Sequence, residues 1–204
     1  MRRFFSLILS LAILLLAVPF SFSASAEETA YPRTVYLEDG GTGDGASASS
    51  PAGSLTELVD AAAEATRVIL TGDYTTAANS TSSNMFVRSA VPVKITAQNG
   101  AKLILSSHIV MQNGALELDD LTIEATGNYW FKMQSHALRV GKNVTCTLGG
   151  DNTTYPAIVG TTEGSVTGKS TSIFVESGEW SVLRGGSTYD KARSTSISTL
   201  SSTA

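Results

Sequence analysis

The feature that most constrains the fold of this chain is an internal repeat of 22 residues. Met111 begins the stretch MQNGALEL and Met133 begins MQSHALRV, so Met, Gln, Ala and Leu recur at equivalent positions. Leu118 of the first copy is matched by Val140 of the second. A recurring period of this size is typical of proteins whose units stack on their neighbours to bury a continuous core. The repeat therefore predicts a solenoid.

The segments around this repeat are short and apolar, and turn-forming residues separate them, as expected for strands. The triplets VKI, LTI and VTC follow one another, and we expect Ile95, Ile123 and Cys146 to stack in one ladder that Ile173 extends. The steps of 28, 23 and 27 residues are uneven because insertions fall in the turns. Successive coils of a parallel β-helix lie about 4.8 Å apart, so like residues stack on like. We therefore predict an all-β right-handed parallel β-helix; the alternative, a sandwich of hairpins, would not need this register.

Residues 54–67 (SLTELVDAAAEATR) carry the one convincing helical pattern. They begin with an S-x-x-E capping box, and their alanines favour a helix. The open end of a solenoid exposes unpaired backbone groups and apolar core, which invites aggregation unless it is covered. We predict that a helix over residues 54–65 is the N-terminal cap. Its apolar stripe would consist of Leu55, Leu58, Val59 and Ala62.

The chain begins with the pattern of a secretory signal peptide. Arg2 and Arg3 precede an almost wholly apolar stretch over residues 4–20, and an A-x-A cleavage pattern ends at Ala26. We predict a bacterial signal peptide over residues 1–26 and a secreted or cell-surface protein. The alternative is an uncleaved membrane anchor, which the cleavage pattern disfavours.

The remaining chain divides into two parts. We expect residues 27–186 to form the β-helix domain. Residues 187–204 contain ten Ser or Thr in 18 positions and no strong strand pattern. This tail either drapes over the last coil or belongs to a further coil that is truncated here.

Composition excludes several classes of partner. The chain has 14 basic and 18 acidic residues, and two of the basic ones lie in the signal peptide. An acidic mature protein without a basic run is expected to repel nucleic acid and anionic membrane surfaces. With a single cysteine, Cys146, no internal disulfide can form. The composition does not indicate an oligomeric state.

Two segments carry a family resemblance. The stretch VYLEDGGTGDGASASSPAGSLTELVDAAAEATRVILTGDYT has a strand, a GTGDG loop, a capping helix and a first coil strand in that order. It resembles the N-terminal segment of the pectate-lyase-like superfamily of right-handed β-helices, most closely the bacterial cell-surface members. The later SIFVESGEWSVLRGGS is similar to coils of large surface proteins of this kind. The family includes polysaccharide lyases, hydrolases and non-catalytic adhesins, so the fold does not choose a function.

The resemblance implies what an active site would need. Lyases of this family use acidic residues that bind calcium and an Arg or Lys base, and the hydrolases use clustered Asp residues. Asp119 and Asp120 are adjacent and would point to opposite faces of a strand. The equivalent positions one coil later are Gly141 and Lys142. We therefore expect a solvated turn here, without a stack of carboxylates.

A candidate calcium loop lies near the N-terminus of the domain. Asp39 and Asp44 fall in the sequence DGGTGDG, where carboxylates and carbonyl oxygens suit Ca²⁺. Gly45 breaks the nearest calcium-repeat pattern, and only one copy is present. The alternative is a plain glycine-rich turn that needs no metal or other cofactor.

The two histidines and the cysteine are weak candidates for catalysis. In the 22-residue register His108 aligns with Trp130, and His136 aligns with Gly114. No Asp is placed to orient either imidazole, so we expect turn or surface histidines. Cys146 occupies an apolar ladder position, where a buried cysteine behaves as a small hydrophobe.

The best candidates for ligand contact are three aromatic residues, Tyr129, Trp130 and Trp180. Exposed aromatic faces stack on sugar rings, and sugars are the usual ligands of the resembled fold. The alternative is that these rings fill corners of the core. We expect a non-catalytic secreted or surface module that binds extracellular polysaccharide or a cell-wall component. A pectate-lyase-like lyase or hydrolase and a purely structural stalk are the alternatives.

These hypotheses differ in the surface that they require. A lyase needs three or more acidic residues and a basic one that converge on one face. A binding module needs exposed aromatic residues, and a stalk needs neither.

Overall fold

The computed structural model describes residues 30–161, 171–187 and 196–199. The described residues from Tyr31 onward form one compact unit. The predicted signal peptide over residues 1–26 and most of the tail over residues 187–204 lie outside the described residues. Within the described part, no helix is long and apolar enough to cross a bilayer.

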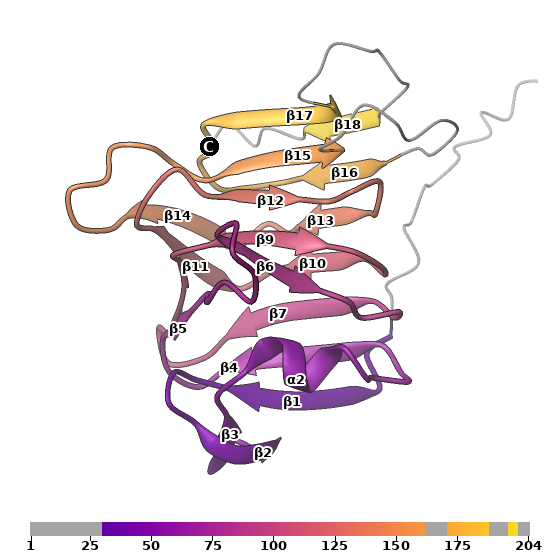
Figure 1. Ribbon diagram of the computed structural model, residues 1–204, viewed down its shortest axis with the longest axis vertical. Helices are drawn as coiled ribbons and strands as arrows, with labels where there is room; N and C mark the ends of the chain where they lie inside the picture. Colours follow the sequence, from indigo (N-terminus) through magenta and orange to yellow (C-terminus); the bar gives the residue numbers. More distant parts are fainter. Residues whose placement is uncertain (1–29, 162–170, 188–195, 200–204) are drawn as a thin grey trace, which may run out of the picture. The chain divides into compact units, whose positions relative to one another are not determined.

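The described chain winds through three β-sheets in turn, and its successive turns stack on one another (Figure 1). The first sheet contains, in spatial order, β18 (Ser196–Thr199), β16 (Ser172–Val175), β13 (Leu138–Val140), β10 (Leu116–Leu118), β7 (Val93–Ala97), β4 (Thr66–Leu70), β1 (Arg33–Leu37), β3 (Ser50–Ala52) and β2 (Thr42–Ser47). The second sheet contains β14 (Val144–Leu148), β11 (Leu121–Ala125), β8 (Lys102–Leu105) and β5 (Tyr74–Thr75). The third sheet contains β17 (Val182–Ser187), β15 (Ala157–Thr161), β12 (Trp130–Lys132), β9 (His108–Met111) and β6 (Asn84–Val87).

All described strand pairs are parallel except the β2–β3 hairpin, and the third sheet takes one strand from each of five turns. The predicted fold class, an all-β parallel β-helix, is confirmed. The hairpin itself was not expected, because its glycine-rich sequence indicated a loop. It extends the first sheet beyond β1.

The 22-residue repeat corresponds to one turn of the solenoid. Leu116 pairs with Leu138 and Leu118 pairs with Val140 across β10 and β13. The register predicted from the two MQ segments is therefore confirmed.

The longer ladder predicted from the apolar triplets is wrong in part. Ile123 and Cys146 do pair, across β11 and β14 of the second sheet. Ile95 lies in the first sheet and pairs with Leu118, and Ile173 also belongs to the first sheet. The error has a physical cause: all three sheets present the same apolar alternation to one shared core, so a triplet does not reveal its sheet.

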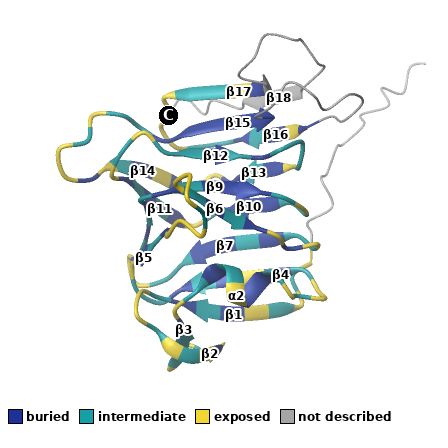
Figure 2. Cartoon of the chain, viewed as in Figure 1, coloured by how far each residue is buried: buried dark blue, intermediate teal, exposed yellow. Residues whose placement is uncertain are grey.

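The core lies between the three sheets. Along most strands buried and more exposed residues alternate, which Figure 2 shows as alternating colours. Each fully buried Leu, Ile or Phe side chain contributes about 1.5–3 kcal/mol relative to an exposed one. The largest fully buried side chains include Phe131, Leu118, Ile123, Ile95 and Met111.

The single described helix, α2 (Leu55–Val59), begins as predicted but is much shorter. The hydroxyl of Ser54 accepts a hydrogen bond from the backbone N–H of Glu57 at 3.3 Å, as a capping residue should. Leu55, Leu58 and Val59 are buried in the core, and the helix contacts β6, the first strand of the third sheet.

The predicted end of this helix at residue 65 is wrong, because α2 stops before Asp60 and Ala62 lies outside its buried stripe. The carboxylate of Asp60 accepts the backbone N–H of Arg88 at 2.7 Å. The chain must also turn so that β4 begins at Thr66, in register with β1. A full set of ladder hydrogen bonds outweighs the few tenths of a kcal/mol per residue by which alanine favours a helix.

Candidate functional site

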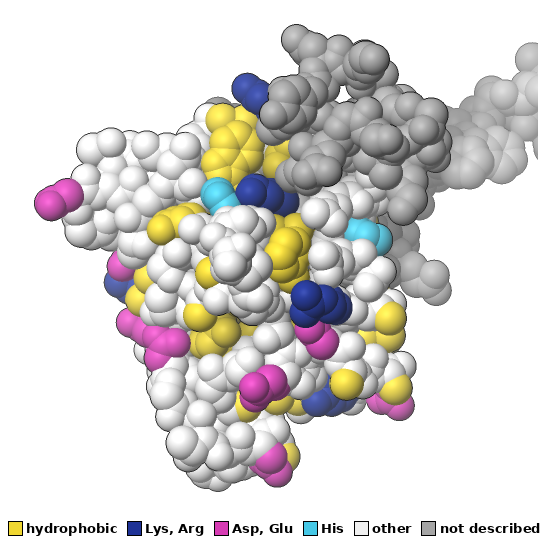
Figure 3. Space-filling model, in the orientation of Figure 1, with side chains coloured by type: hydrophobic (Ala, Val, Ile, Leu, Met, Phe, Trp, Pro, Cys, Tyr) yellow, Lys and Arg dark blue, Asp and Glu magenta, His cyan; other side chains and the backbone are white. Residues whose placement is uncertain are grey.

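The outer face of the third sheet carries two of the predicted aromatic residues. In β12, Phe131 is fully buried, so its neighbours Trp130 and Lys132 point away from the core. His108 of β9 pairs with Asn84 of β6 and lies beside Trp130. On this face a histidine, basic side chains and hydrophobic side chains lie next to one another at the surface (Figure 3). We call this set the third-sheet patch: Asn84, His108, Tyr129, Trp130 and Lys132.

His108 is held in one orientation. Its Nδ1 accepts a hydrogen bond from the backbone N–H of Trp130 at 3.1 Å. The ring of Tyr129 meets it edge-on, with ring centroids 5.7 Å apart. Burial, and then the charge of Lys132, lowers the pKa of His108 to about 4. The imidazole is therefore neutral at pH 7, and since Nδ1 accepts a hydrogen bond, the ring proton lies on Nε2.

Lys132 reaches from β12 past β9 to β6. Its Nζ donates to Oδ1 of Asn84 at 3.1 Å, and the amide of Asn84 is itself held by Ser82 at 2.8 Å. Burial lowers the pKa of Lys132. Val110 lies on β9, the strand between β12 and β6. Its side chain is buried but is not part of the core cluster. Lys132 is thus a positioned ammonium group among apolar side chains and the side-chain amide of Asn84.

Trp180, the third predicted aromatic residue, does not belong to the third-sheet patch. Its Nε1 donates to the carbonyl oxygen of Ser177 at 3.0 Å, and its ring packs edge-on against the fully buried Phe131. Trp180 is packed against the core, which agrees with the alternative that its ring fills a corner of the core.

The two predicted calcium ligands each bind the chain itself. Asp39 accepts hydrogen bonds from the backbone N–H of Thr75 at 2.9 Å and from its hydroxyl at 2.7 Å. Asp44 accepts from the backbone N–H of Ala46 at 3.0 Å. No group of three or more His, Cys, Asp or Glu side chains among the described residues could hold a metal ion. Both carboxylates thus accept hydrogen bonds from within the chain, and the calcium site at Asp39 and Asp44 stays a prediction.

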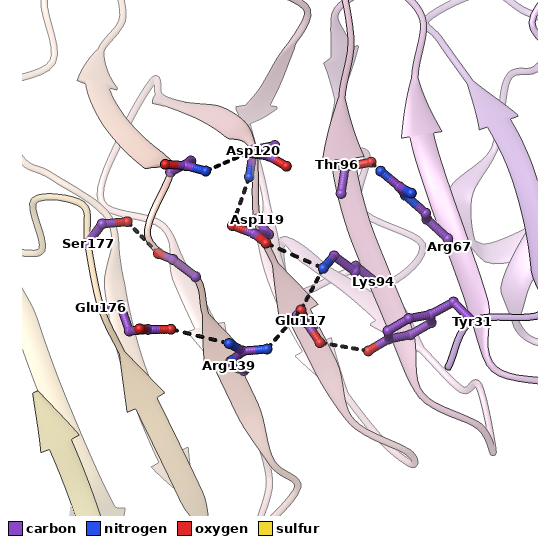
Figure 4. A network of polar contacts seen from close by, with 12 residues as sticks. Tyr31, Arg67, Lys94, Thr96, Glu117, Asp119, Asp120, Arg139, Glu176 and Ser177 are labelled. Atoms are coloured by element: carbon purple, nitrogen blue, oxygen red, sulfur yellow. Dashed lines mark hydrogen bonds and ion pairs between the residues drawn. The ribbon is translucent and has the colours of Figure 1, made fainter. Parts of the chain in front are cut away.

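A second polar site, on the outer face of the first sheet, was not predicted (Figure 4). Lys94, Glu117 and Arg139 lie side by side on β7, β10 and β13. Nζ of Lys94 is 2.8 Å from Glu117, and Arg139 is 3.4 Å from the same carboxylate. We call the whole set the charged ladder: Tyr31, Lys94, Glu117, Asp119, Arg139 and Glu176.

The repeat contained a signal for this ladder. The charged residue stands between two apolar ones in VKI, LEL and LRV, and the 22-residue register already aligned Glu117 with Arg139. Asp119 also joins it, because its carboxylate is 3.3 Å from Nζ of Lys94. The prediction of a purely solvated turn is thus wrong for Asp119. Asp120 remains in the turn, with φ at +46° and a hydrogen bond from Asn143.

The charged ladder has the residue types of a catalytic cluster, but its lysine is not in the deprotonated form that a general base needs. Three carboxylates and two bases converge, as the lyase hypothesis requires. Burial lowers the pKa of Lys94, but the hydrogen bond and charge of Glu117, together with Asp119, raise it overall. A lysine held in its protonated form cannot accept a proton at neutral pH. The arrangement is that of a closed network of ion pairs.

His136 and Cys146 are the two other candidates for catalysis. Nε2 of His136 lies 2.9 Å from the carbonyl oxygen of Gln112. Burial raises the pKa of the Cys146 thiol to about 12, so it stays protonated.

Comparisons with family models, with curated proteins and with solved structures found no match.

Proposed function

We propose that the protein is a non-catalytic module, secreted or on the cell surface, and that its third-sheet patch binds carbohydrate. The observation that carries this proposal is the position of Trp130, whose partly exposed indole lies beside positioned polar side chains. Indole rings offer a large apolar face, and a few fixed polar groups supply orientation and specificity. The resemblance to surface β-helices supports the same class of ligand.

The polar groups of the patch are held by the fold. Nε1 of Trp130 donates to Oδ1 of Asn128 at 3.0 Å, which fixes the plane of the indole. His108 and Lys132 are fixed by hydrogen bonds to Trp130 and Asn84. Side chains that are already ordered lose little conformational entropy when a ligand binds.

The lyase alternative requires a free basic group, and in the charged ladder Lys94 and Arg139 are both held in ion pairs with carboxylates. A purely structural stalk would have no use for a positioned indole and amine on an outer face. We therefore place the binding function on the third sheet.

The purified protein should bind at least one member of a panel of bacterial and plant polysaccharides in affinity electrophoresis or on a glycan array. Trp130→Ala should weaken that binding about five- to thirtyfold, because stacking contributes about 1–2 kcal/mol. Tyr36→Ala is the matched control, since Tyr36 is a partly exposed aromatic residue on β1 of the first sheet. Circular dichroism verifies that both variants fold.

Three outcomes would overturn the proposal. The first is full retention of binding by Trp130→Ala, and the second is no binding to any polysaccharide. The third is the appearance of unsaturated, ultraviolet-absorbing products when the wild-type protein is incubated with the panel and Ca²⁺, which would establish a lyase.

A further inference from the structure

Lys132 differs from Lys94 and Lys102, the two other partly buried lysines among the described residues, in having no counter-ion. Nζ of Lys94 and of Lys102 each lie 2.8 Å from a glutamate oxygen. Among the described residues Lys132 forms no ion pair, and its Nζ donates a hydrogen bond to the neutral amide of Asn84. A half-buried cation held by a neutral acceptor keeps its electrostatic attraction for an incoming anion.

His108 supplies a second donor next to this cation. Its Nδ1 is already occupied by the backbone N–H of Trp130, so Nε2 carries the ring proton. Nε2 has no hydrogen-bond partner in the described part of the chain. It is also not fully buried, so it reaches the surface. Lys132 is close enough for its charge to act on the imidazole. An N–H donor and an ammonium group therefore share one side of the sheet.

The described outward positions of the third sheet bear no negative charge, although the chain as a whole is acidic. Each of the other two sheets places a glutamate on its outer face, Glu117 and Glu124, where it pairs with a lysine. The outward positions of β6, β9, β12 and β15 carry no carboxylate. They are Asn84, Phe86, His108, Val110, Trp130, Lys132, Ala157 and Val159.

We propose that Lys132 and His108 form a subsite for a tetrahedral oxyanion, a sulfate or phosphate ester carried by the bound glycan. The inference rests on the proposed carbohydrate-binding function and adds the chemical class of the substituent. A planar carboxylate is matched best by the parallel donors of an arginine fork, which this subsite lacks. An ammonium group and a single imidazole N–H are separate point donors, and a tetrahedral oxyanion can accept from both along different oxygens.

The two histidines of the chain provide a direct test, since His108 lies in the subsite and His136 does not. Imidazole signals are followed by NMR while sodium sulfate, phosphate, acetate or chloride is added at constant ionic strength. Sulfate and phosphate should shift the His108 signals saturably, and acetate and chloride should not. His136 should respond to none of them. Lys132→Gln should weaken sulfate binding at least fivefold, and Lys142→Gln, at an exposed lysine, should leave it unchanged.

Equal shifts with chloride, or an unchanged response in Lys132→Gln, would overturn the subsite. Acetate binding as tightly as sulfate would overturn its tetrahedral selectivity. Dextran, dextran sulfate and carboxymethyl dextran then separate the two proposals. If neutral glycans bind through Trp130 but sulfation adds nothing, the subsite fails alone. If free sulfate binds at His108 but no glycan binds, the carbohydrate function fails and the subsite stands.

Discussion

His108 is the described residue whose protonation is most strongly opposed by the fold. Its Nδ1 faces the backbone N–H of Trp130, and a proton added there would bring two N–H groups together. Burial, and then the charge of Lys132, lowers the pKa of His108 in the folded state to about 4, against 6.5 for a free imidazole. Between these two values the unfolded chain binds a proton that the folded protein does not. The contribution of His108 to stability is therefore complete above pH 6.5 and is lost as the pH falls to about 4.

We expect the wild-type protein to lose about 1–2 kcal/mol of unfolding free energy through His108 between pH 7 and pH 4, after allowance for partial exposure. His108→Asn removes the titrating group and should flatten this part of the pH profile. Urea unfolding at several pH values measures the effect. His136→Asn, the control, should keep the wild-type slope, and the same slope in His108→Asn would contradict the assignment.

Strands of the first sheet are joined on their outer face by ion pairs as well as by backbone hydrogen bonds. Glu117 lies at the centre of this arrangement, with its side chain only 8% exposed and cations on both sides. The hydroxyl of Tyr31 also donates to its carboxylate at 2.9 Å, which ties the segment before β1 to β10. On the second sheet, Glu124 forms a single pair with Lys102, which is 41% exposed. The lysine–glutamate pairs of the first and second sheets thus differ in their exposure to solvent.

Glu117→Gln should lower the unfolding free energy by about 1–3 kcal/mol, because Lys94 and Arg139 each lose one of two carboxylate partners at a poorly solvated position. Glu124→Gln should lower it by less than about 1 kcal/mol, because exposed pairs are screened by water. Thermal and urea unfolding of the two variants give the comparison. Equal effects would show that burial does not distinguish these two networks.

At the scale of the whole described domain, each turn of the solenoid contacts mainly the turns above and below it. The hydrophobic core is continuous, but strand pairing links only neighbours, such as β10 with β7 and β13. Stability in such architectures is close to a sum of terms for single repeats and for adjacent pairs. Damage in one turn should therefore weaken the structure locally before it spreads.

Leu118→Ala removes a fully buried side chain of β10 and should cost about 2–5 kcal/mol. Hydrogen exchange measured by mass spectrometry should accelerate most in β10 and in its partners β7 and β13, and least in β1. A uniform acceleration in all strands would mean that the domain behaves as one indivisible unit.

Much of the fold follows from local pattern. The 22-residue period places Leu118 beside Val140 because parallel strands stack residues of equal register. Ser54 begins the helix because its hydroxyl satisfies a free N–H. Residue type alone predicts Tyr129 and Trp130 as ligand contacts; the structure places both next to His108, and their contact with a ligand stays a prediction.

The repeat, the alternation of core and surface and the start of the helix can be read from the chain alone, because each depends on neighbours along the chain or on one constant period. The end of α2, the sheet that receives Ile95, and the pairing of Lys132 with Asn84 but of Lys94 with Glu117 follow only from the folded arrangement. These outcomes depend on insertions in the turns, which determine the residues that pair between one turn and the next. Spacing in the sequence does not predict that pairing, because three sheets share one core and the same apolar pattern.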